Sequence, residues 1–367
     1  LQGRPYKRGG CGMVSVLSVL VTLVAAIAAL TATFDTFTLV RDHLVYNRKE
    51  SLRKYIIRII LMVPAYSISA LGGIMYKDSC IYFDTARECY EAFVIYSFLQ
   101  FLIEFLGGDD VLPGKLAEKE PQYHLFPLCM MRSWEMGNEF FENVKIGTLQ
   151  YVVVKPILAW MSFALHQNGL YDAGNFRIDR GYLWITIVTN MSQVWAMYCL
   201  ALFYFACKTD LAPLRPMGKF MVVKAVVFFT WWQSVVLAFL VRVDWIHRSG
   251  DYSVEDVVNS TQNFLICLEM LGAAMAHRHT FPVRDFRQLF SDRNNTRSTV
   301  KSIFDAVNVT DVFVRDVWEA GSKLKDRAAQ IRSGLPAGTK FGDVEMSPLI
   351  YRWDQEECHL PQPRPDS

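Results

Sequence analysis

The sequence predicts an all-α, polytopic membrane protein with seven transmembrane helices and a cytosolic amphipathic C-terminal helix. Of its 367 residues 52% are hydrophobic and only 20% are charged, which is apolar for a soluble domain. Seven apolar stretches approach the roughly 20 residues that a helix needs to cross a bilayer. The formal net charge is only +2, and basic residues collect at the ends of the apolar stretches. That pattern favours membrane lipids as partners and gives no support for nucleic acid.

The predicted spans, in chain order, are uncharged or carry a few charges each. The first and the fifth contain no charged residue, whereas four of the others hold a Lys or Glu. Arg4, Lys7 and Arg8 precede the first span, so a signal peptide is the alternative there, but its uncharged run exceeds the usual ~7 to 15 residues. The sequence opens on Leu1, which leaves open whether residues precede it. The spans are 13–33, 59–76, 88–107, 147–166, 182–207, 217–241 and 257–277.

Lys and Arg in the connecting loops predict the orientation. Eleven lie in the loops 40–54, 108–146 and 208–216, against six in the three loops on the other side. Because cytosolic loops are enriched in Lys and Arg, the N-terminus is expected outside and the C-terminus inside. The protein is then expected to be a multi-pass integral membrane protein. The expected regions are an extracellular or lumenal segment 1–12, a transmembrane domain 13–279, a cytosolic tail 280–335 and a disordered end 336–367.

Two charged residues lie deep in predicted spans. Lys155 and Glu269 are each about 12 Å from the cytosolic end of their span, at about 1.5 Å per residue. A charge at that depth normally faces protein, water or an opposite charge, so the two are expected to pair inside the bundle. A structural ion pair that locks the helices is the main alternative. Lys224 and Glu104 are shallower, and for them snorkelling toward the interface is an equal alternative.

Polar side chains also recur at helical spacing on three spans, which predicts a polar interior. Amides in membrane helices join neighbouring helices more often than they bind a solute, so that alternative stays open. The stripes are Asn259, Gln262, Asn263 and Glu269 on the last span, Asn190 and Gln193 on the fifth, and Gln100 and Glu104 on the third.

Five phrases that occur in order resemble one family of membrane proteins. They are KYIIRIILMVPAYSISALGG, ARECYEAFVIYSFLQFL, VVVKPILA, KFMVVKAVVFFTWWQ and FLICLEMLGAAMAH. The resemblance is to the organic solute transporter alpha, transmembrane protein 184 and Lazarus-type family, and it covers roughly residues 13 to 335. The residues that match these phrases are Arg58, Pro64, Glu91, Lys155, Pro156, Lys224, Trp232, Gln233, Glu269 and Met270.

The resemblance implies seven transmembrane helices and facilitated transport of bile acids or conjugated steroids. We therefore expect a transporter of an amphipathic organic solute, a steroid-, bile-acid- or lipid-like anion, through a polar site in the inner half of the membrane. The resemblance also implies the plasma membrane or an endosomal or vacuolar membrane, and the alpha subunit of the family needs a single-span partner. A single-span accessory subunit or a homodimer is therefore a candidate partner here. The alternative is a receptor or a trafficking scaffold that transports nothing. The expected binding residues are Lys155, Glu269, Lys224, Gln233, Gln262, Asn263, Asn190, Gln193, Gln100 and Glu104.

The cysteines and the tail add smaller expectations. Cys80 and Cys89 both fall on the predicted outer side and are a candidate disulfide. Cys129 and Cys207 are candidate palmitoylation sites, with an unmodified buried thiol as the alternative. Between residues 299 and 332, apolar residues at helical spacing predict an amphipathic helix. It lies either on the inner leaflet or against the bundle.

The sequence gives no support for an enzyme. It contains none of the short signatures of zinc proteases, serine hydrolases or nucleotide-binding loops. No Cys or His spacing fits a zinc site, so neither a metal nor another cofactor is expected.

Overall fold

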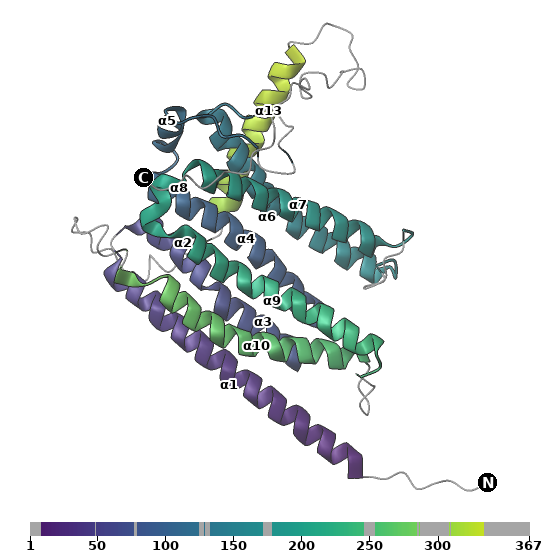
Figure 1. Ribbon diagram of the computed structural model, residues 1–367. Coiled ribbons are helices and arrows are strands. Elements are labelled where there is room, and N and C mark those ends of the chain that lie inside the picture. The colour runs from purple at the N-terminus through teal and green to yellow at the C-terminus, as the bar shows by residue number, and fades with distance from the viewer. Residues whose placement is uncertain are drawn as a thin grey trace.

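The computed structural model is a bundle of long helices (Figure 1). It describes residues 9–47, 49–76, 79–124, 128, 133–171, 178–245, 254–284, 286, 308 and 310–333. No β-strand occurs within these ranges, so the all-α prediction is confirmed for them. The elements in chain order are α1 (Gly9–Tyr46), α2 (Glu50–Ile60), α3 (Met62–Met75), α4 (Cys80–Leu106), α5 (Leu112–Ala117), α6 (Asn138–Gln167), α7 (Gly181–Ala206), α8 (Lys208–Leu211), η2 (Ala212–Leu214), α9 (Pro216–Arg242), α10 (Val254–Thr280), η3 (Asp311–Asp316) and α13 (Val317–Ser333).

Within the described part of the chain, six helical segments are long and apolar enough to cross a membrane. They correspond to the first six spans that the sequence predicts. The expected seventh span is α10, which has the same length as α9, 27 residues, but whose carboxylates and amides make it too polar for this set. The six segments are Ser18–Tyr46, Glu50–Met75, Cys80–Leu106, Asn138–Gln167, Gly181–Ala206 and Pro216–Arg242.

The helices alternate in direction, so their ends gather at two ends of the bundle (Figure 1). α1, α4, α7 and α10 end on the side that also holds α5, α8 and the C-terminal helix α13. We call this side the predicted cytosolic end, because the basic loops of the sequence lie there. The opposite side, where α3, α6 and α9 end, is the predicted outer end.

Several helices begin earlier than their apolar stretches. α6 starts at Asn138 and α4 at Cys80, each well before the first residue of the predicted span. Polar residues at the ends of a membrane helix continue its backbone hydrogen bonding into the interface, so hydropathy alone places the ends too far inward. The second span is divided into α2 and α3 at Leu61. Pro64 lacks the amide hydrogen that the carbonyl four residues earlier would accept, which favours that break.

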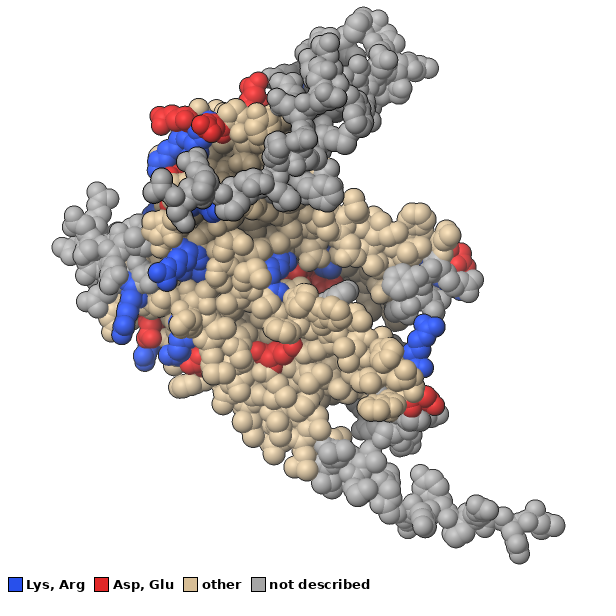
Figure 2. Space-filling view, viewed as in Figure 1, with Lys and Arg blue, Asp and Glu red and all other residues tan. Residues whose placement is uncertain are grey.

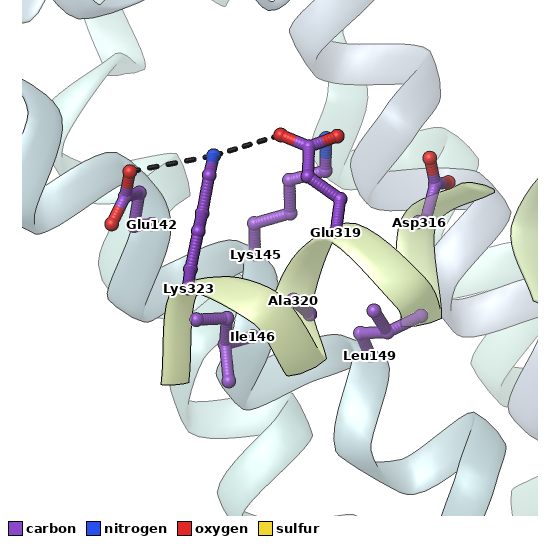
Figure 3. Close-up of a pocket in the computed structure, with 8 residues that line it drawn as sticks. All are labelled: Glu142, Lys145, Ile146, Leu149, Asp316, Glu319, Ala320 and Lys323. Carbon is purple, nitrogen blue, oxygen red and sulfur yellow. Dashed lines mark ion pairs between the residues drawn. The ribbon is translucent and has the colours of Figure 1, made fainter. Parts of the chain in front are cut away.

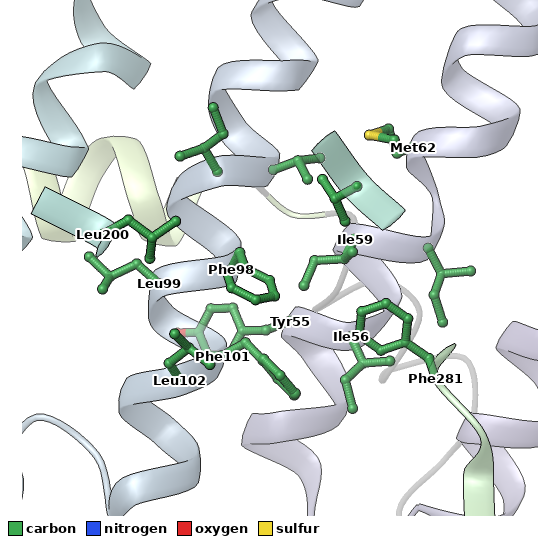
Figure 4. Close-up of a cluster of buried hydrophobic side chains, with 14 of the residues drawn as sticks. Tyr55, Ile56, Ile59, Met62, Phe98, Leu99, Phe101, Leu102, Leu200 and Phe281 are labelled. Carbon is green, nitrogen blue, oxygen red and sulfur yellow. The ribbon is translucent and has the colours of Figure 1, made fainter. Parts of the chain in front are cut away.

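The most buried packing lies between α2 and α4 (Figure 4). Tyr55, Ile56 and Ile59 from α2 meet Phe98 and Phe101 from α4 there. Lipid tails are as apolar as these side chains, so close dispersion contact rather than transfer from water holds such a core together. α2, α3 and α4 are therefore the scaffold on which the outer helices rest.

The α6–α7 pair lies along one side of this scaffold (Figure 1). The two helices approach closely at Gly147, where an added Cβ would collide with the sulfur of Cys199. Among the described residues, α6 packs extensively against α7 and α4, whereas α7 packs mainly against α6 and touches α4 at few positions. α1, α9 and α10 form the other side of the bundle.

The tail helix predicted from the sequence is present as η3 and α13. It docks on the bundle, which is one of the two expected arrangements, while Val314, Trp318 and Leu324 remain exposed. The predicted disordered end, 336–367, lies outside the described residues.

Candidate functional site

Two oppositely charged pairs meet between α4, α6 and α9. Lys155 Nζ on α6 lies 2.8 Å from Glu88 Oε2 on α4. Lys224 Nζ on α9 lies 3.6 Å from Glu91 Oε1, also on α4. From α7, Gln193 Nε2 donates a hydrogen bond of 3.2 Å to the same Glu91 oxygen. We call these five residues the charged cluster.

Helical geometry brings the two carboxylates together. Glu88 and Glu91 are three residues apart on α4, so they project from neighbouring positions on one face. Lys155 reaches them from the second half of α6, immediately before Pro156. Four separate helices therefore contribute to the cluster, and a shift of any one of them changes its geometry.

The members of the cluster differ in how far they are buried. The side chain of Lys155 is 11% exposed, whereas that of Glu88 is 54% exposed. Lys224 and Glu91 are 17% and 13% exposed. In the space-filling view, basic and acidic atoms lie together in a recess between the α6–α7 pair and α9 (Figure 2). The ammonium groups are thus held inside, and Glu88 is the member most open to a ligand.

The cluster has no net formal charge, since two ammonium groups face two carboxylates. In a medium of low dielectric constant, removing one partner of such a pair leaves a costly uncompensated charge. An anion that takes the place of Glu88 at Lys155 avoids that cost, because the displaced carboxylate is half exposed and can turn to water. The cluster can therefore bind an anionic group by exchanging it for one of its own acids.

The expected pairing of Lys155 with Glu269 is wrong. Glu269 instead accepts a hydrogen bond from Gln233 Nε2 between α9 and α10. The depth estimate failed because α6 begins at Asn138 rather than near residue 147. Lys155 consequently lies past the midpoint of α6 toward the predicted outer end, while Glu269 lies past the midpoint of α10 toward the predicted cytosolic end.

Of the residues expected in the site, Lys155, Lys224 and Gln193 come together in the cluster. Gln233 and Glu269 form the second polar contact just described. The other expected residues are dispersed. Asn263 meets Arg87 at 3.4 Å, Gln100 donates to Tyr96, Glu104 lies 3.6 Å from Lys49, Asn190 donates to its own helix at Thr186 O, and Gln262 is partly buried on α10.

Sequence reasoning missed Glu88 as a site residue and left Glu91 without a role. The predicted third span began at residue 88, which placed Glu88 at the membrane boundary. Asp84, Glu88 and Glu91 nevertheless follow the i, i+4, i+7 spacing of one helix face. That acidic stripe was the available signal, and it required knowing that the helix begins at Cys80.

The disulfide expected between Cys80 and Cys89 is not formed. Both thiols are free, and both residues belong to the single helix α4, where nine residues of separation place them far beyond bonding distance. Cys207 is buried at the end of α7, so palmitoylation there would require this end to open. Cys129 lies outside the described residues. Among those residues, no group of three or more His, Cys, Asp or Glu is arranged to hold a metal ion.

Comparison with known proteins gives one consistent family. The family model described as organic solute transporter Ostalpha matches residues 21–286. A transmembrane protein 184 homolog of Dictyostelium discoideum is 38% identical over 251 residues, which cover 68% of this chain and 49% of that protein. Protein LAZ1 homolog 1 of Arabidopsis thaliana is 34% identical over 268 residues, 68% of this chain and 54% of that protein.

A third relative, protein LAZ1 of Arabidopsis thaliana, is 33% identical over 326 residues, which are 83% of this chain and 67% of that protein. The chain spans about half the length of the first two relatives. A search of solved structures found no match. The match of the family model to most of the chain, together with these relatives, shows that the chain belongs to the organic solute transporter Ostalpha family.

Proposed function

We propose that the protein carries an amphipathic organic anion, of the steroid, bile-acid or lipid type, across its membrane by facilitated transport. The charged cluster is the binding site for the anionic group, with Lys155 and Lys224 as its cationic partners. The observation that carries the proposal is the meeting of two shielded lysines with two carboxylates in a recess of the bundle. Membership of the Ostalpha family is consistent with solute transport.

In this proposal Glu88 and Glu91 act as internal substitutes for the substrate. When the site is empty, each carboxylate neutralises one lysine, so that no unpaired charge is left in the bundle. When a substrate arrives, its anionic group displaces Glu88, the most exposed member, and the ammonium of Lys155 exchanges one partner for another. Release reverses the exchange, which fits reversible transport without a covalent step.

An amphipathic substrate also needs a surface for its apolar part. α7 and α9 flank the recess, and Phe228, one helical turn from Lys224 on α9, is an exposed large apolar side chain near that face. A steroid or acyl body that follows these helices would keep its apolar surface out of water while its charged group stays at the cluster. This division of labour is typical of ligand sites with few, well-placed polar groups.

The proposal includes a seventh transmembrane helix, α10, with the N-terminus outside and the C-terminus in the cytosol. α10 is as long as α9 and packs along α1, α3 and α9. Two polar residues in its middle face neighbouring helices: Asn263 contacts Arg87 on α4, and Glu269 contacts Gln233 on α9. A polar helix is tolerated in a membrane when its polar groups are satisfied inside the bundle.

Flux into proteoliposomes of the purified chain tests the proposal. Conjugated steroids and bile acids are supplied outside, and uptake is compared for the wild type, Lys155→Met and Lys119→Met. Lys119 is the matched control, because it also pairs with a carboxylate, Asp210, but at the predicted cytosolic end. We expect uptake by the wild type and by Lys119→Met and its loss in Lys155→Met.

Thermal unfolding of each variant in detergent separates a lost site from a lost fold. A Lys155→Met chain that melts like the wild type and still takes up substrate would contradict the proposal. Absence of flux in the wild type, with every conjugate tested, would favour the receptor or scaffold alternative instead.

A further inference from the structure

A C-terminal arm, made of residue 308 and residues 310–333, crosses the outside of the bundle from α2 to α6. Its first contact is with α2. Asp311 Oδ2 lies 2.7 Å from Lys54 Nζ, and its Oδ1 lies 2.7 Å from the Arg58 guanidinium. The same guanidinium donates a 2.6 Å hydrogen bond to the carbonyl of Asn308. The side chain of Arg58 is 1% exposed, so the arm covers it.

The electrostatics of this contact favour a docked arm. Burial alone would raise the pKa of Asp311, but the hydrogen bonds and positive charges of Lys54 and Arg58 outweigh it and hold the pKa below its ordinary value. Asp311 is therefore ionised at neutral pH. Charge-assisted hydrogen bonds of this kind are the stronger ones in proteins.

The middle of the arm fills the groove between α4 and α6. Tyr96 OH on α4 donates a 3.0 Å hydrogen bond to Asp316, which is buried. Val312 is fully buried and packs against Phe93 of α4 and Leu149 of α6. η3, which contains these arm residues, is a π-helical segment, and such segments are rare and often functional.

The far part of the arm is fastened to α6. Arg327 donates to Glu142 Oε2 at 2.6 Å and to Asn143 Oδ1 at 2.8 Å. Figure 3 shows Lys323 reaching between Glu142 on α6 and Glu319 on α13, at 3.4 Å and 2.8 Å. Only a shallow hollow remains between α6 and α13, so this contact is a packed joint rather than a ligand site.

The arm thus bridges α2 and α6, and among the described residues these two helices have no extensive contact with each other. Each of them instead packs extensively against α4, and α7 packs mainly against α6. The charged cluster lies where this pair meets α4 and α9. The recess widens when α6 and α7 move away from α9 and thus relative to α2 and α4, and the arm spans that joint.

We propose that the C-terminal arm is a strap that restrains the α6–α7 pair and thereby limits opening of the recess that holds the charged cluster. This inference rests on the proposed function only for its consequence, which is that the docked arm slows the transport cycle. The mechanical claim, that the arm limits the distance between α7 and α9, stands apart from transport.

The test uses the full chain with spin labels at Met191→Cys on α7 and Val236→Cys on α9, both of which are exposed positions. The other reactive cysteines are replaced by serine. Distances between the labels are measured by double electron–electron resonance in nanodiscs. The strap variants are Asp311→Asn and Arg327→Met, and the matched control is Asp210→Asn, which also loses one ion pair at the same end of the bundle but none with the arm.

We expect both strap variants to broaden the α7–α9 distances toward longer values and to raise the rate of uptake roughly twofold or more, while Asp210→Asn changes neither. Distances identical to those of the wild type in both strap variants would overturn the inference, whereas broader distances with slower uptake would overturn its consequence for the transport cycle. Broader distances in a chain whose wild type transports nothing would support the strap and overturn the transport proposal instead. Unfolding curves for all variants identify any that fail to fold. Because the two strap variants act at separate anchors, the test can still be made with one of them if the other does not fold.

Discussion

Lys155 Nζ on α6 lies 2.8 Å from Glu88 Oε2 on α4, and the two partners are unequally shielded. The ammonium is almost enclosed, whereas more than half of the carboxylate side chain is exposed. A shielded cation with an accessible counter-ion suits the proposed binding of an anion, because the anionic group of a ligand can approach Lys155 from the side on which Glu88 is exposed. The pair also connects α6 to the scaffold helix α4.

The unequal shielding predicts unequal costs of substitution. Glu88→Gln leaves an ammonium enclosed without its partner and should destabilise the fold, by about 1 to 3 kcal/mol. Lys155→Met leaves a carboxylate that is half exposed and should cost less. The measurement is the free energy of unfolding of each variant in detergent. The double variant Glu88→Lys with Lys155→Glu should recover most of the free energy of unfolding that Glu88→Gln loses. If the double variant is as unstable as Glu88→Gln, the ion pair does not account for that loss.

A second prediction concerns the close approach of α6 and α7. A methyl group added at Gly147 would collide with the sulfur of Cys199 and approach Trp195 Nε1 to 3.0 Å. Gly147→Ala should therefore lower stability by about 1 to 3 kcal/mol, the usual cost of overpacking. Gly272→Ala on α10 is the control, because its Cβ would meet nothing within 4 Å and alanine favours a helix.

Thermal unfolding of these variants tests this prediction. Gly147→Ala should melt earlier than the wild type, Gly272→Ala should not, and Cys199→Gly in the Gly147→Ala chain should restore part of the loss. Equal melting of the two alanine variants would mean that α6 and α7 are not in close contact at Gly147.

The sequence predicted the helical class and six spans that the described residues contain, because hydrophobicity is a property of contiguous residues. It did not predict which charges meet. Pairing Lys155 with Glu269 assumed that each helix begins where its apolar run begins, and α6 begins at Asn138 instead. Glu88 was the first residue of its predicted span, at the membrane boundary, for the same reason. Lys224 and Gln193 were expected in a polar interior, but Glu91, their common partner, is revealed only by how α7 and α9 pack around α4.

The docking site of the tail helix could not be predicted from the sequence either. Its amphipathic spacing predicted a helix and left its partner undecided between membrane and bundle. Docking on the bundle depends on residues that are distant in the sequence, because the arm forms its ion pairs with Lys54, Arg58 and Glu142. No local pattern in the tail identifies them.

A third prediction follows from the charge of the arm. The pKa of Asp311 is held below its ordinary value by Lys54 and Arg58, with Arg315 and Tyr55 also near it. A depressed pKa stabilises docking at every pH above the ordinary value of an aspartate, about 3.9, and that stabilisation is lost only as the pH falls through the lower value in the docked state. The arm should therefore stay docked between about pH 5 and pH 8 and loosen only below about pH 4.

The mobility of a spin label at Ser322→Cys, an exposed position on α13, measures this dependence. The label should be slow from pH 5 to pH 8 and faster below pH 4, whereas in the Asp311→Asn chain it should be fast throughout. Loosening of the wild-type arm near pH 6 would show that another group controls docking.

The central claim is that the charged cluster recognises an anion, and equilibrium binding tests it most directly. Isothermal titration of the purified chain in nanodiscs compares a steroid sulfate with its unconjugated parent steroid. We predict that the wild type binds the sulfate about tenfold or more tightly than the parent, as expected for charge-assisted hydrogen bonds. We predict further that Lys155→Met with Lys224→Met abolishes this preference while the control Lys119→Met retains it. Equal preference for the sulfate in all three chains would contradict the account.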